Sequence, residues 1–201
     1  MSRKCESHTR FVADRVVDIC YSLCSSERIF HMSGVESFAR ELVPSGRYSF
    51  ETIRLLAWGH DMFRDLPGNR LLRLARYYGV VSQREEELHP VSLHGKVAAA
   101  YLSDRFGVDD AITKAIYWHV TGSAEMGELG EILMIADMGE EGREFAAASE
   151  IRLSAFVDRK KTALDVIRFK MLWALEERRP ILDEIVSCWN HYLRRYQSDT
   201  D

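Results

Sequence analysis

Apolar residues along the chain recur three and four positions apart, the spacing of one helix face, and the alternation typical of strands is almost absent. Serine or aspartate before such segments, and glycine or proline after them, mark where helices begin and end. These signals predict helices over residues 11–24, 27–43, 49–63, 69–79, 90–107, 109–122 and 128–140, and one or two long helices over 158–196 interrupted at Pro180. The polar segment 82–89 is expected to be a loop. The sequence therefore predicts an all-α fold and a single domain over residues 1–201.

Composition and charge narrow the classes of function. Of the 201 residues, 46% are apolar, enough for one sizeable core. The net charge of -4 argues against non-specific binding to nucleic acid or to a membrane surface. Because the charged start "MSRKCESHTRFVADR" leaves no room for a signal-peptide core and no run approaches a membrane span, we expect a cytoplasmic protein. The cysteines, which form no CxxC pair, are expected to be reduced, buried thiols: Cys5, Cys20, Cys24 and Cys188.

Six polar side chains stand at apolar positions on five predicted helices. They are His31, His60, Asp61, His94, His119 and Asp137. A single histidine on an apolar face is more often a hydrogen-bonded core residue than a ligand, and an ionised carboxylate such as Asp61 is costly to bury without a compensating positive charge. Convergence of such groups from several helices is how helical bundles build dinuclear metal sites. His8, His89 and His191 lie in terminal or polar contexts, and we expect them to be solvated.

The same residues carry a family resemblance. His31, the adjacent pair His60 and Asp61, and Asp137 reproduce the H…HD…D pattern of the HD-domain metal-dependent phosphohydrolases. The surrounding segments are more specific: "RIFH" at 28–31, "HDMFRDLP" at 60–67, "LHG" at 93–95, "HVTG" at 119–122, "IADMGEEGREF" at 135–145, and "RPI" at 179–181 followed by Asn190. In order and spacing, residues 25–195 resemble the YqeK family of symmetrical bis(5'-nucleosyl)-tetraphosphatases, which cut diadenosine tetraphosphate into two ADP. Residues 1–24 would form an additional N-terminal helix.

This resemblance implies an HD-domain helical bundle with a dinuclear metal site in its core. His31, His60, Asp61 and Asp137 would surround one metal ion, and His94 and His119 would hold the second, with Asp61 bridging. A carboxylate has two oxygens and can bridge two cations about 3.5–4 Å apart, which a neutral imidazole cannot do. Because imidazole-rich coordination disfavours magnesium, we expect two divalent ions, iron first, with manganese or zinc as alternatives.

The implied chemistry is attack of a metal-bound hydroxide on a phosphoanhydride, with metals and arginines neutralising the developing charge. Arg64, where the family usually has lysine, is expected to act beside Asp61 in catalysis. The candidates for substrate binding are Arg28, Arg64, Thr121, Gly122, Arg143 and Arg179. The expected substrate is a dinucleoside polyphosphate and the product a nucleoside diphosphate.

The chain also departs from the family pattern. Lys96 replaces a proline, Glu141 the proline of an "EP" pair, and residues 182–185 an "HPxT" motif. Hydrolysis at the metal pair is therefore better supported than the identity of the nucleotide. Two alternatives remain: another HD phosphohydrolase acting on a mononucleotide, an alarmone or a cyclic dinucleotide, and an HD module that binds a nucleotide or a protein without turnover. The apolar segments 11–24 and 163–174 leave room for a homodimer face.

Overall fold

The computed structural model describes the backbone of residues 3–198 and the side chains of residues 6–198. Within this range every regular element is a helix and no strand occurs, which confirms the all-α fold. The helices are α1 (Arg3–Leu23), α2 (Ser26–Leu42), α3 (Phe50–Gly59), α4 (Gly68–Tyr77), α5 (Arg84–Leu88), the 3-10 helix η1 (Pro90–Leu93), α6 (His94–Phe106), α7 (Asp110–Trp118), α8 (Gly127–Gly139), α9 (Ala148–Ser154), α10 (Arg159–Glu176) and α11 (Asp183–Ser198).

Side-chain caps explain where several helices begin and end. Ser25, Ser49 and Asp109 accept hydrogen bonds from the free backbone N–H groups in the first turns of α2, α3 and α7. Gly107 ends α6 in the left-handed conformation, with φ of +59°, which suits a residue without Cβ. The sequence signals used to predict these helix ends therefore correspond to real capping contacts.

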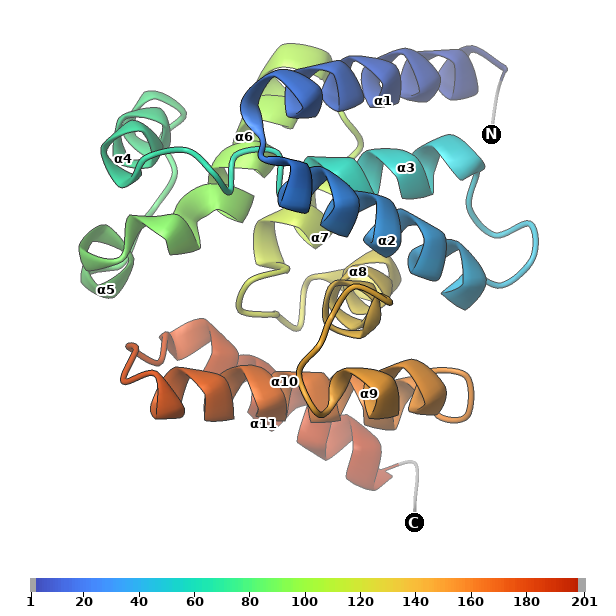
Figure 1. Ribbon diagram of the computed structural model, residues 1–201, viewed down its shortest axis with the longest axis vertical. Helices are drawn as coiled ribbons and strands as arrows, with labels where there is room; N and C mark the ends of the chain where they lie inside the picture. Colours follow the sequence, from blue (N-terminus) through green and yellow to red (C-terminus); the bar gives the residue numbers. More distant parts are fainter. Residues whose placement is uncertain (1–2, 199–201) are drawn as a thin grey trace.

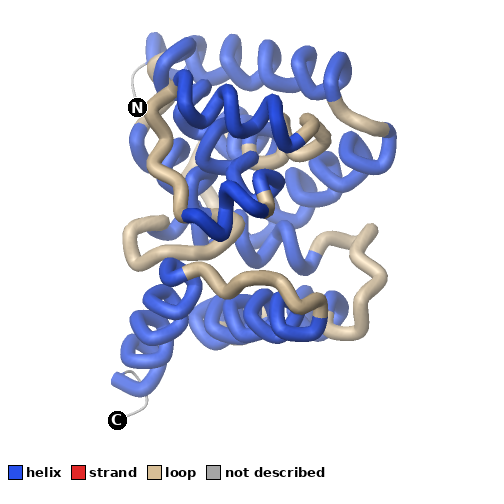
Figure 2. The backbone as a smooth tube through the Cα atoms, turned by 90° about the vertical axis from the view of Figure 1, so that its left-hand side faces the viewer, coloured by secondary structure: helices blue, strands red, loops and turns tan. Residues whose placement is uncertain are grey.

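The helices α1, α2, α3, α6, α7 and α8 are stacked around one core (Figures 1 and 2). The helix α1 packs against α3, α2 packs against α3 and α8, and α7 packs between α6 and α8. Below them α10 pairs with α11, and α10 also touches α8 and α9. The core side chains Leu56, Val97, Ile116 and Leu133, from α3, α6, α7 and α8, are fully buried. Any polar group that these helices turn inward is thus shielded from water.

Some boundaries differ from those expected. The segment expected to be a loop contains the short helix α5, because Glu86 accepts the backbone N–H of Gln83 and pairs with Lys96 of α6. The helix expected to reach residue 63 stops at Gly59, and tight turns replace its last part. His94 opens α6 and does not lie inside it, since Pro90 starts a 3-10 turn. The helix α9 was not predicted, whereas the break near Pro180 is confirmed.

The structure bears on two further predictions, the absence of a membrane span and the state of the cysteines. None of the helices in the described part of the chain combines the length and the apolar character needed to cross a bilayer. Cys20, Cys24 and Cys188 are free thiols; Cys20 and Cys188 are buried and Cys24 is half-buried. The side chain of Cys5 lies outside the described residues.

Candidate metal centre

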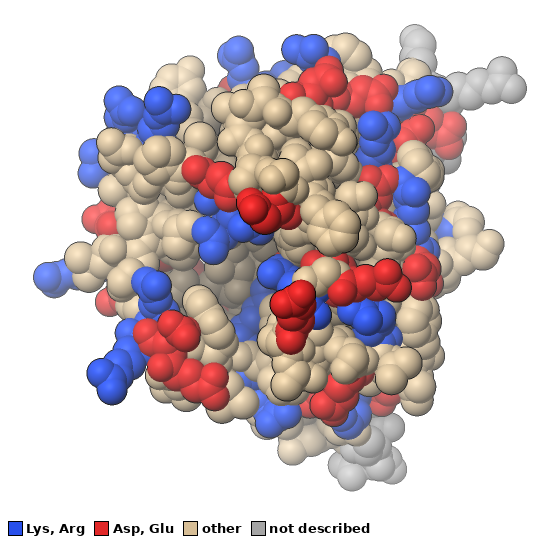
Figure 3. All heavy atoms as spheres, in the orientation of Figure 1, with Lys and Arg blue, Asp and Glu red and all other residues tan. Residues whose placement is uncertain are grey.

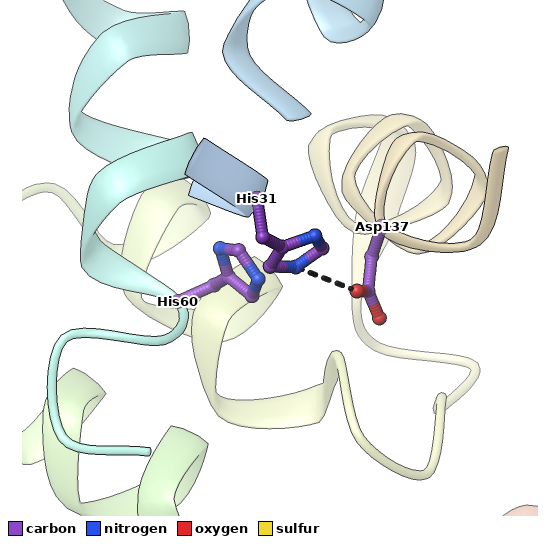
Figure 4. Close-up of side chains that lie close together, drawn as sticks. All are labelled: His31, His60 and Asp137. Carbon is purple, nitrogen blue, oxygen red and sulfur yellow. Dashed lines mark ion pairs between the residues drawn. The ribbon is translucent and has the colours of Figure 1, made fainter. Parts of the chain in front are cut away.

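The six side chains that interrupt the apolar faces come together in the structure. They are His31 of α2, His60 and Asp61 directly after α3, His94 at the start of α6, His119 directly after α7, and Asp137 in the last turns of α8. All six are buried, none being more than 9% exposed. We refer to them as the histidine–aspartate cluster. Figure 4 shows three of them, with His31 and His60 turned toward each other and His31 facing Asp137.

Asp61 lies between two sets of histidines. Its Oδ1 is 2.9 Å from Nε2 of His94 and 3.8 Å from Nε2 of His119. Its Oδ2 is 3.8 Å from Nε2 of His31 and 3.7 Å from Nε2 of His60. Each carboxylate oxygen therefore faces a different pair of imidazoles, the arrangement required of a carboxylate that bridges two cations.

Local backbone contacts orient three of the histidines. In His60, His94 and His119, Nδ1 lies 2.6, 2.5 and 2.8 Å from the backbone carbonyl oxygen of the residue three positions earlier. A carbonyl oxygen only accepts hydrogen bonds, so Nδ1 must carry the proton. These carbonyls lie in the last turn of a helix, and that of Val91 also accepts the backbone N–H of His94. The result is that Nε2 of each ring, with its lone pair, faces the cluster.

His31 is oriented differently, by a side chain distant in sequence. Its Nδ1 lies 3.1 Å from Oε1 of Glu140, and its Nε2 lies 3.2 Å from Oδ1 of Asp137. Glu140 is 2% exposed and also accepts the backbone N–H of Gly142. A carboxylate behind an imidazole raises the basicity of the ring and is a common outer partner of metal-binding histidines.

The cluster contains more acceptors than donors. Nε2 of His94 and Nε2 of His119 are 3.0 Å apart, although both atoms present lone pairs, and Nε2 of His60 is buried with no hydrogen-bond partner among the described residues. Converging acceptors without a donor are unfavourable in a buried site unless a cation lies among them. Imidazole nitrogens with inward-facing lone pairs are typical ligands of transition-metal ions, so this donor set fits a metal ion.

Two subsets of the cluster have the spacing of metal ligands. One is His31, His60 and Asp137, and the other is His60, Asp61 and His119; within each, the ligand atoms lie within 4.8 Å of one another. His60 belongs to both subsets. The geometry therefore brings together all six residues expected to hold metal, and it permits two neighbouring ion positions.

Burial and neighbouring charges set the protonation states that ligands need. Burial lowers the pKa of His60 to about 4 and holds the pKa of His119 well below its usual range. Burial alone would raise the pKa of Asp61, but His60, His94 and Arg28 hold it well below its usual range. The imidazoles of His60 and His119 are thus neutral and the Asp61 carboxylate is ionised at neutral pH, as metal coordination requires.

Two arginines expected to bind substrate lie beside the cluster. Arg28 forms an ion pair with Asp61 and lies 3.5 Å from Asp65. Arg143 places Nη2 2.5 Å from Oδ1 of Asp137 and donates from Nε to the Asp137 backbone carbonyl. Their side chains are 21% and 32% exposed, so both lie between the buried carboxylates and solvent. Figure 3 shows a hollow in the face of the molecule drawn there, with lysine and arginine atoms at its edge.

The other expected binding residues lie in different settings. Arg64 is half-buried in the turn after Asp61 and forms no ion pair with any described residue, which leaves its guanidinium available. Arg179 is exposed and lies 3.3 Å from Nδ1 of His89. His89 is therefore half-buried in a contact and not fully solvated as expected.

Thr121 and Gly122 are engaged by the protein itself. The Thr121 hydroxyl donates to the carbonyl of Gly122, and the Gly122 N–H donates to the carbonyl of Trp118 at 2.6 Å. Gly122 has φ of +72°, and a Cβ there would lie 2.6 Å from Sγ of Cys188. The glycine is thus explained by a turn and by close packing, and its N–H is not directed to a ligand.

Two residues that contact the cluster were missed by the sequence analysis. Glu140 was noted only as part of a motif, and its position three residues after Asp137 was the available signal. Lys170 of α10 lies with Nζ 3.6 Å from Oδ2 of Asp137. No local pattern distinguishes this lysine from the other basic residues of its helix.

Known proteins of similar sequence share one description. No protein-family model matches the chain. Three relatives are each described as a symmetrical bis(5'-nucleosyl)-tetraphosphatase. One from Staphylococcus aureus is 28% identical over 59% of this chain and 66% of its own length. One from Halalkalibacterium halodurans is 25% identical over 84% of this chain and 90% of its own, and one from Bacillus subtilis is 23% identical over 83% and 89%.

A solved structure extends the comparison to the fold. It is a protein from Clostridium acetobutylicum described as a predicted HD superfamily hydrolase involved in NAD metabolism. The two chains superpose with a TM-score of 0.83 and 25% identity over 90% of this chain and 97% of the other. The HD-domain helical bundle and the resemblance to the symmetrical tetraphosphatases are both confirmed.

Proposed function

We propose that this chain, a metal-dependent phosphohydrolase that resembles the symmetrical bis(5'-nucleosyl)-tetraphosphatases, hydrolyses dinucleoside tetraphosphates to two nucleoside diphosphates. The observation that carries the proposal is the position of Asp61. Its two oxygens face different pairs of imidazoles in a buried cluster of acceptors. A binding module without turnover has no need of a carboxylate that bridges two cations.

The residues of the cluster would hold two divalent metal ions. His31, His60 and Asp137 are the proposed ligands of one ion and His94 and His119 of the other, with Asp61 between them. When bound, such ions lower the pKa of an attacking water and polarise the phosphoryl oxygen. We propose iron as the physiological metal, with manganese and zinc as substitutes, because the set is rich in imidazole. Elemental analysis of protein purified without added metal tests this choice.

The arginines beside the cluster would bind the polyphosphate. Arg28 and Arg143 contact different carboxylates of the cluster, Asp61 and Asp137, and each reaches toward solvent. Guanidinium groups bind phosphate oxygens through paired hydrogen bonds, and they would neutralise charge on the leaving nucleoside diphosphate. Arg64, in the turn that follows Asp61, is the proposed third cation. Arg179, which is exposed and lies beside His89, would contact the substrate from the protein surface.

Product analysis tests the proposed cleavage. Protein loaded with Fe²⁺ or Mn²⁺ and incubated with diadenosine tetraphosphate should release ADP alone, and chelator should stop the reaction. ATP together with AMP would mean asymmetric cleavage and would refute the proposal. A panel containing a mononucleotide, an alarmone, a cyclic dinucleotide and NAD covers the alternative substrates. Bound metal with no hydrolysis of any of these would favour the binding module.

The proposed homodimer stays a prediction. Phe11 and Tyr21 of α1 are 57% and 66% exposed, and Trp173 of α10 is 57% exposed. Exposed aromatic residues of this kind are typical of protein interfaces. Sedimentation of the wild-type protein and of a Tyr21→Ser variant should separate a dimer through α1 from a monomer.

A further inference from the structure

Lys170 of α10 contacts two residues of the histidine–aspartate cluster, Asp137 and His119. Lys170 lies in the middle of α10, and its side chain is 13% exposed. Its Nζ donates to the backbone carbonyl of His119 at 2.6 Å and lies 3.5 Å from that of Val120. The same atom is 3.6 Å from Oδ2 of Asp137. One ammonium group therefore touches the end of α7 and the carboxylate of α8.

Three protein oxygens lie within 3.6 Å of this ammonium. A lysine ammonium has three N–H donors and no acceptor, and three oxygens surround Nζ here. The Lys170 side chain is 13% exposed and its ammonium faces protein oxygens, whereas the side chains of Arg28 and Arg143 are 21% and 32% exposed. The two carbonyls belong to the segment that carries His119, and the carboxylate belongs to a proposed ligand of the other metal ion.

We propose that Lys170 is a positioning residue for the metal pair, which fixes Asp137 and the backbone of His119 relative to each other. This inference rests on the proposed function of the cluster as a metal centre. In Figure 4 one oxygen of Asp137 faces His31, and the other points away from both histidines shown. Lys170 pairs with the oxygen that His31 does not contact, so it holds the carboxylate with Oδ1 directed at the cluster. Its hydrogen bonds to the backbone carbonyls of His119 and Val120 hold the segment that carries His119 to the same ammonium group.

Positioning and charge predict opposite effects on metal binding. If Lys170 orients the ligands, its removal loosens Asp137 and His119, and outer partners of metal ligands typically contribute about 10–100-fold in metal affinity. If its positive charge were the dominant effect, removal would relieve repulsion toward a bound cation and metal would bind more tightly. The direction of the change thus decides between the two.

Metal titration of three variants tests the proposal without reference to the substrate. Chelator-treated protein is titrated with Mn²⁺ alone and free Mn²⁺ is followed by electron paramagnetic resonance. The variant Lys170→Met keeps the length of the side chain and removes the donors, and Lys170→Arg restores a cationic donor. Lys161→Met is the matched control, because Lys161 lies on the same helix and pairs with Asp165 at the surface, away from the cluster. Circular dichroism and thermal unfolding confirm that each variant is folded.

We expect Lys170→Met to bind Mn²⁺ about 10–100-fold more weakly, Lys170→Arg to recover part of the loss, and Lys161→Met to match wild type. In turnover of diadenosine tetraphosphate, kcat should fall in Lys170→Met while KM stays within about twofold, because no phosphate contact is lost. Unchanged or tighter Mn²⁺ binding in Lys170→Met would overturn the positioning role alone. Wild-type protein that takes up no Mn²⁺ would overturn the proposed metal centre as well. If Lys170→Met does not fold, Lys170→Arg carries the test, and wild-type affinity in that variant together with lost affinity in Lys170→Gln supports the proposal.

Discussion

Gly95 leaves room for the ring of His119, and adding a single methyl group there should disturb the metal centre. A Cβ at this position would lie 2.6 Å from Cε1 and 2.7 Å from Nδ1 of His119, and 2.8 Å from the carbonyl oxygen of Ile116. Carbon atoms in good contact are about 3.5–4 Å apart, so the methyl group overlaps the ring by about 0.9 Å. The Ile116 carbonyl holds Nδ1 of the same ring, and the backbone on that side cannot move freely.

Gly95→Ala should lower the free energy of unfolding only slightly but should weaken metal binding strongly. Overpacking of this kind costs about 1–3 kcal/mol, and alanine gains about 1 kcal/mol over glycine within a helix, so Gly95→Ala should lose at most about 2 kcal/mol of unfolding free energy. Ligand distances in metal sites are held within about 0.2 Å, and a ring displaced by nearly 1 Å falls outside that range. We expect metal affinity to fall about 10–100-fold, as when an outer partner of a ligand is lost.

The assay compares Gly95→Ala with Gly107→Ala. Gly107 has φ of +59°, and a Cβ there would have no atom within 4 Å. Alanine at this position should therefore lower the free energy of unfolding by about 1–2 kcal/mol through backbone strain alone. Urea unfolding measures the two stability losses, and calorimetric titration of chelator-treated protein with Mn²⁺ or Zn²⁺ measures affinity. Equal affinity in Gly95→Ala and wild type, or an equal loss in Gly107→Ala, would refute the reasoning.

Three further outcomes follow from the structure. Asp61→Asn should bind one metal ion where the wild type is expected to bind two, and it should lose at least about 10²–10³-fold in kcat with helical content unchanged; two bound ions in this variant would contradict the bridging role. In chelator-treated protein, burial keeps His60 neutral down to its pKa of about 4, whereas in the unfolded chain His60 takes up a proton below its usual pKa of 6.5. The free energy of unfolding should therefore fall by about 3 kcal/mol as the pH drops from 6.5 toward 4. Urea unfolding of wild type against His60→Gln at pH 7 and pH 4.5 should show this difference, and parallel pH profiles would contradict it. Lys96→Met leaves the buried carboxylate of Glu86 unpaired and should cost about 3–5 kcal/mol in urea unfolding, with recovery in the double variant Lys96→Met with Glu86→Gln.

Local chemistry explains which features the sequence could predict. Ser25, Ser49 and Asp109 cap helices through contacts within three residues, so helix starts were readable. His60 and His119 bond the carbonyl three residues earlier, which makes their orientation a local property as well. The convergence of the cluster was expected from the family resemblance together with the apolar setting of each residue.

Contacts between distant segments explain what the sequence analysis missed. The helix α5 forms where a loop was expected, since Glu86 finds Lys96 on another helix. Lys170 follows His119 by 51 residues in the sequence, and it is one of several basic residues on α10, so no local pattern indicated its contact with the cluster. The sequence makes Gly122 a candidate for phosphate binding, but its conformation is explained by a turn and by close packing against Cys188, which only the structure reveals.

His31 is the one histidine of the cluster whose orientation depends on a distant carboxylate, and this difference can be measured. Glu140 holds its Nδ1 across 109 residues of sequence. Burial lowers the pKa of His31, but Asp137 and Glu140 raise it above its usual value overall. Glu140→Gln keeps an oxygen acceptor and removes the charge, so the pKa of His31 should fall.

Imidazole NMR titration of chelator-treated protein should show this change at His31, with His60 and His94 retaining the Nδ1–H tautomer that their backbone carbonyls impose. Metal affinity should fall about tenfold, the lower end of the effect of losing an outer partner. Glu141→Gln is the matched control, because Glu141 is adjacent and exposed. A change of tautomer at His60 or His94 in Glu140→Gln would mean that the cluster is oriented as one coupled network, and the distinction between local and distant orientation would then be wrong.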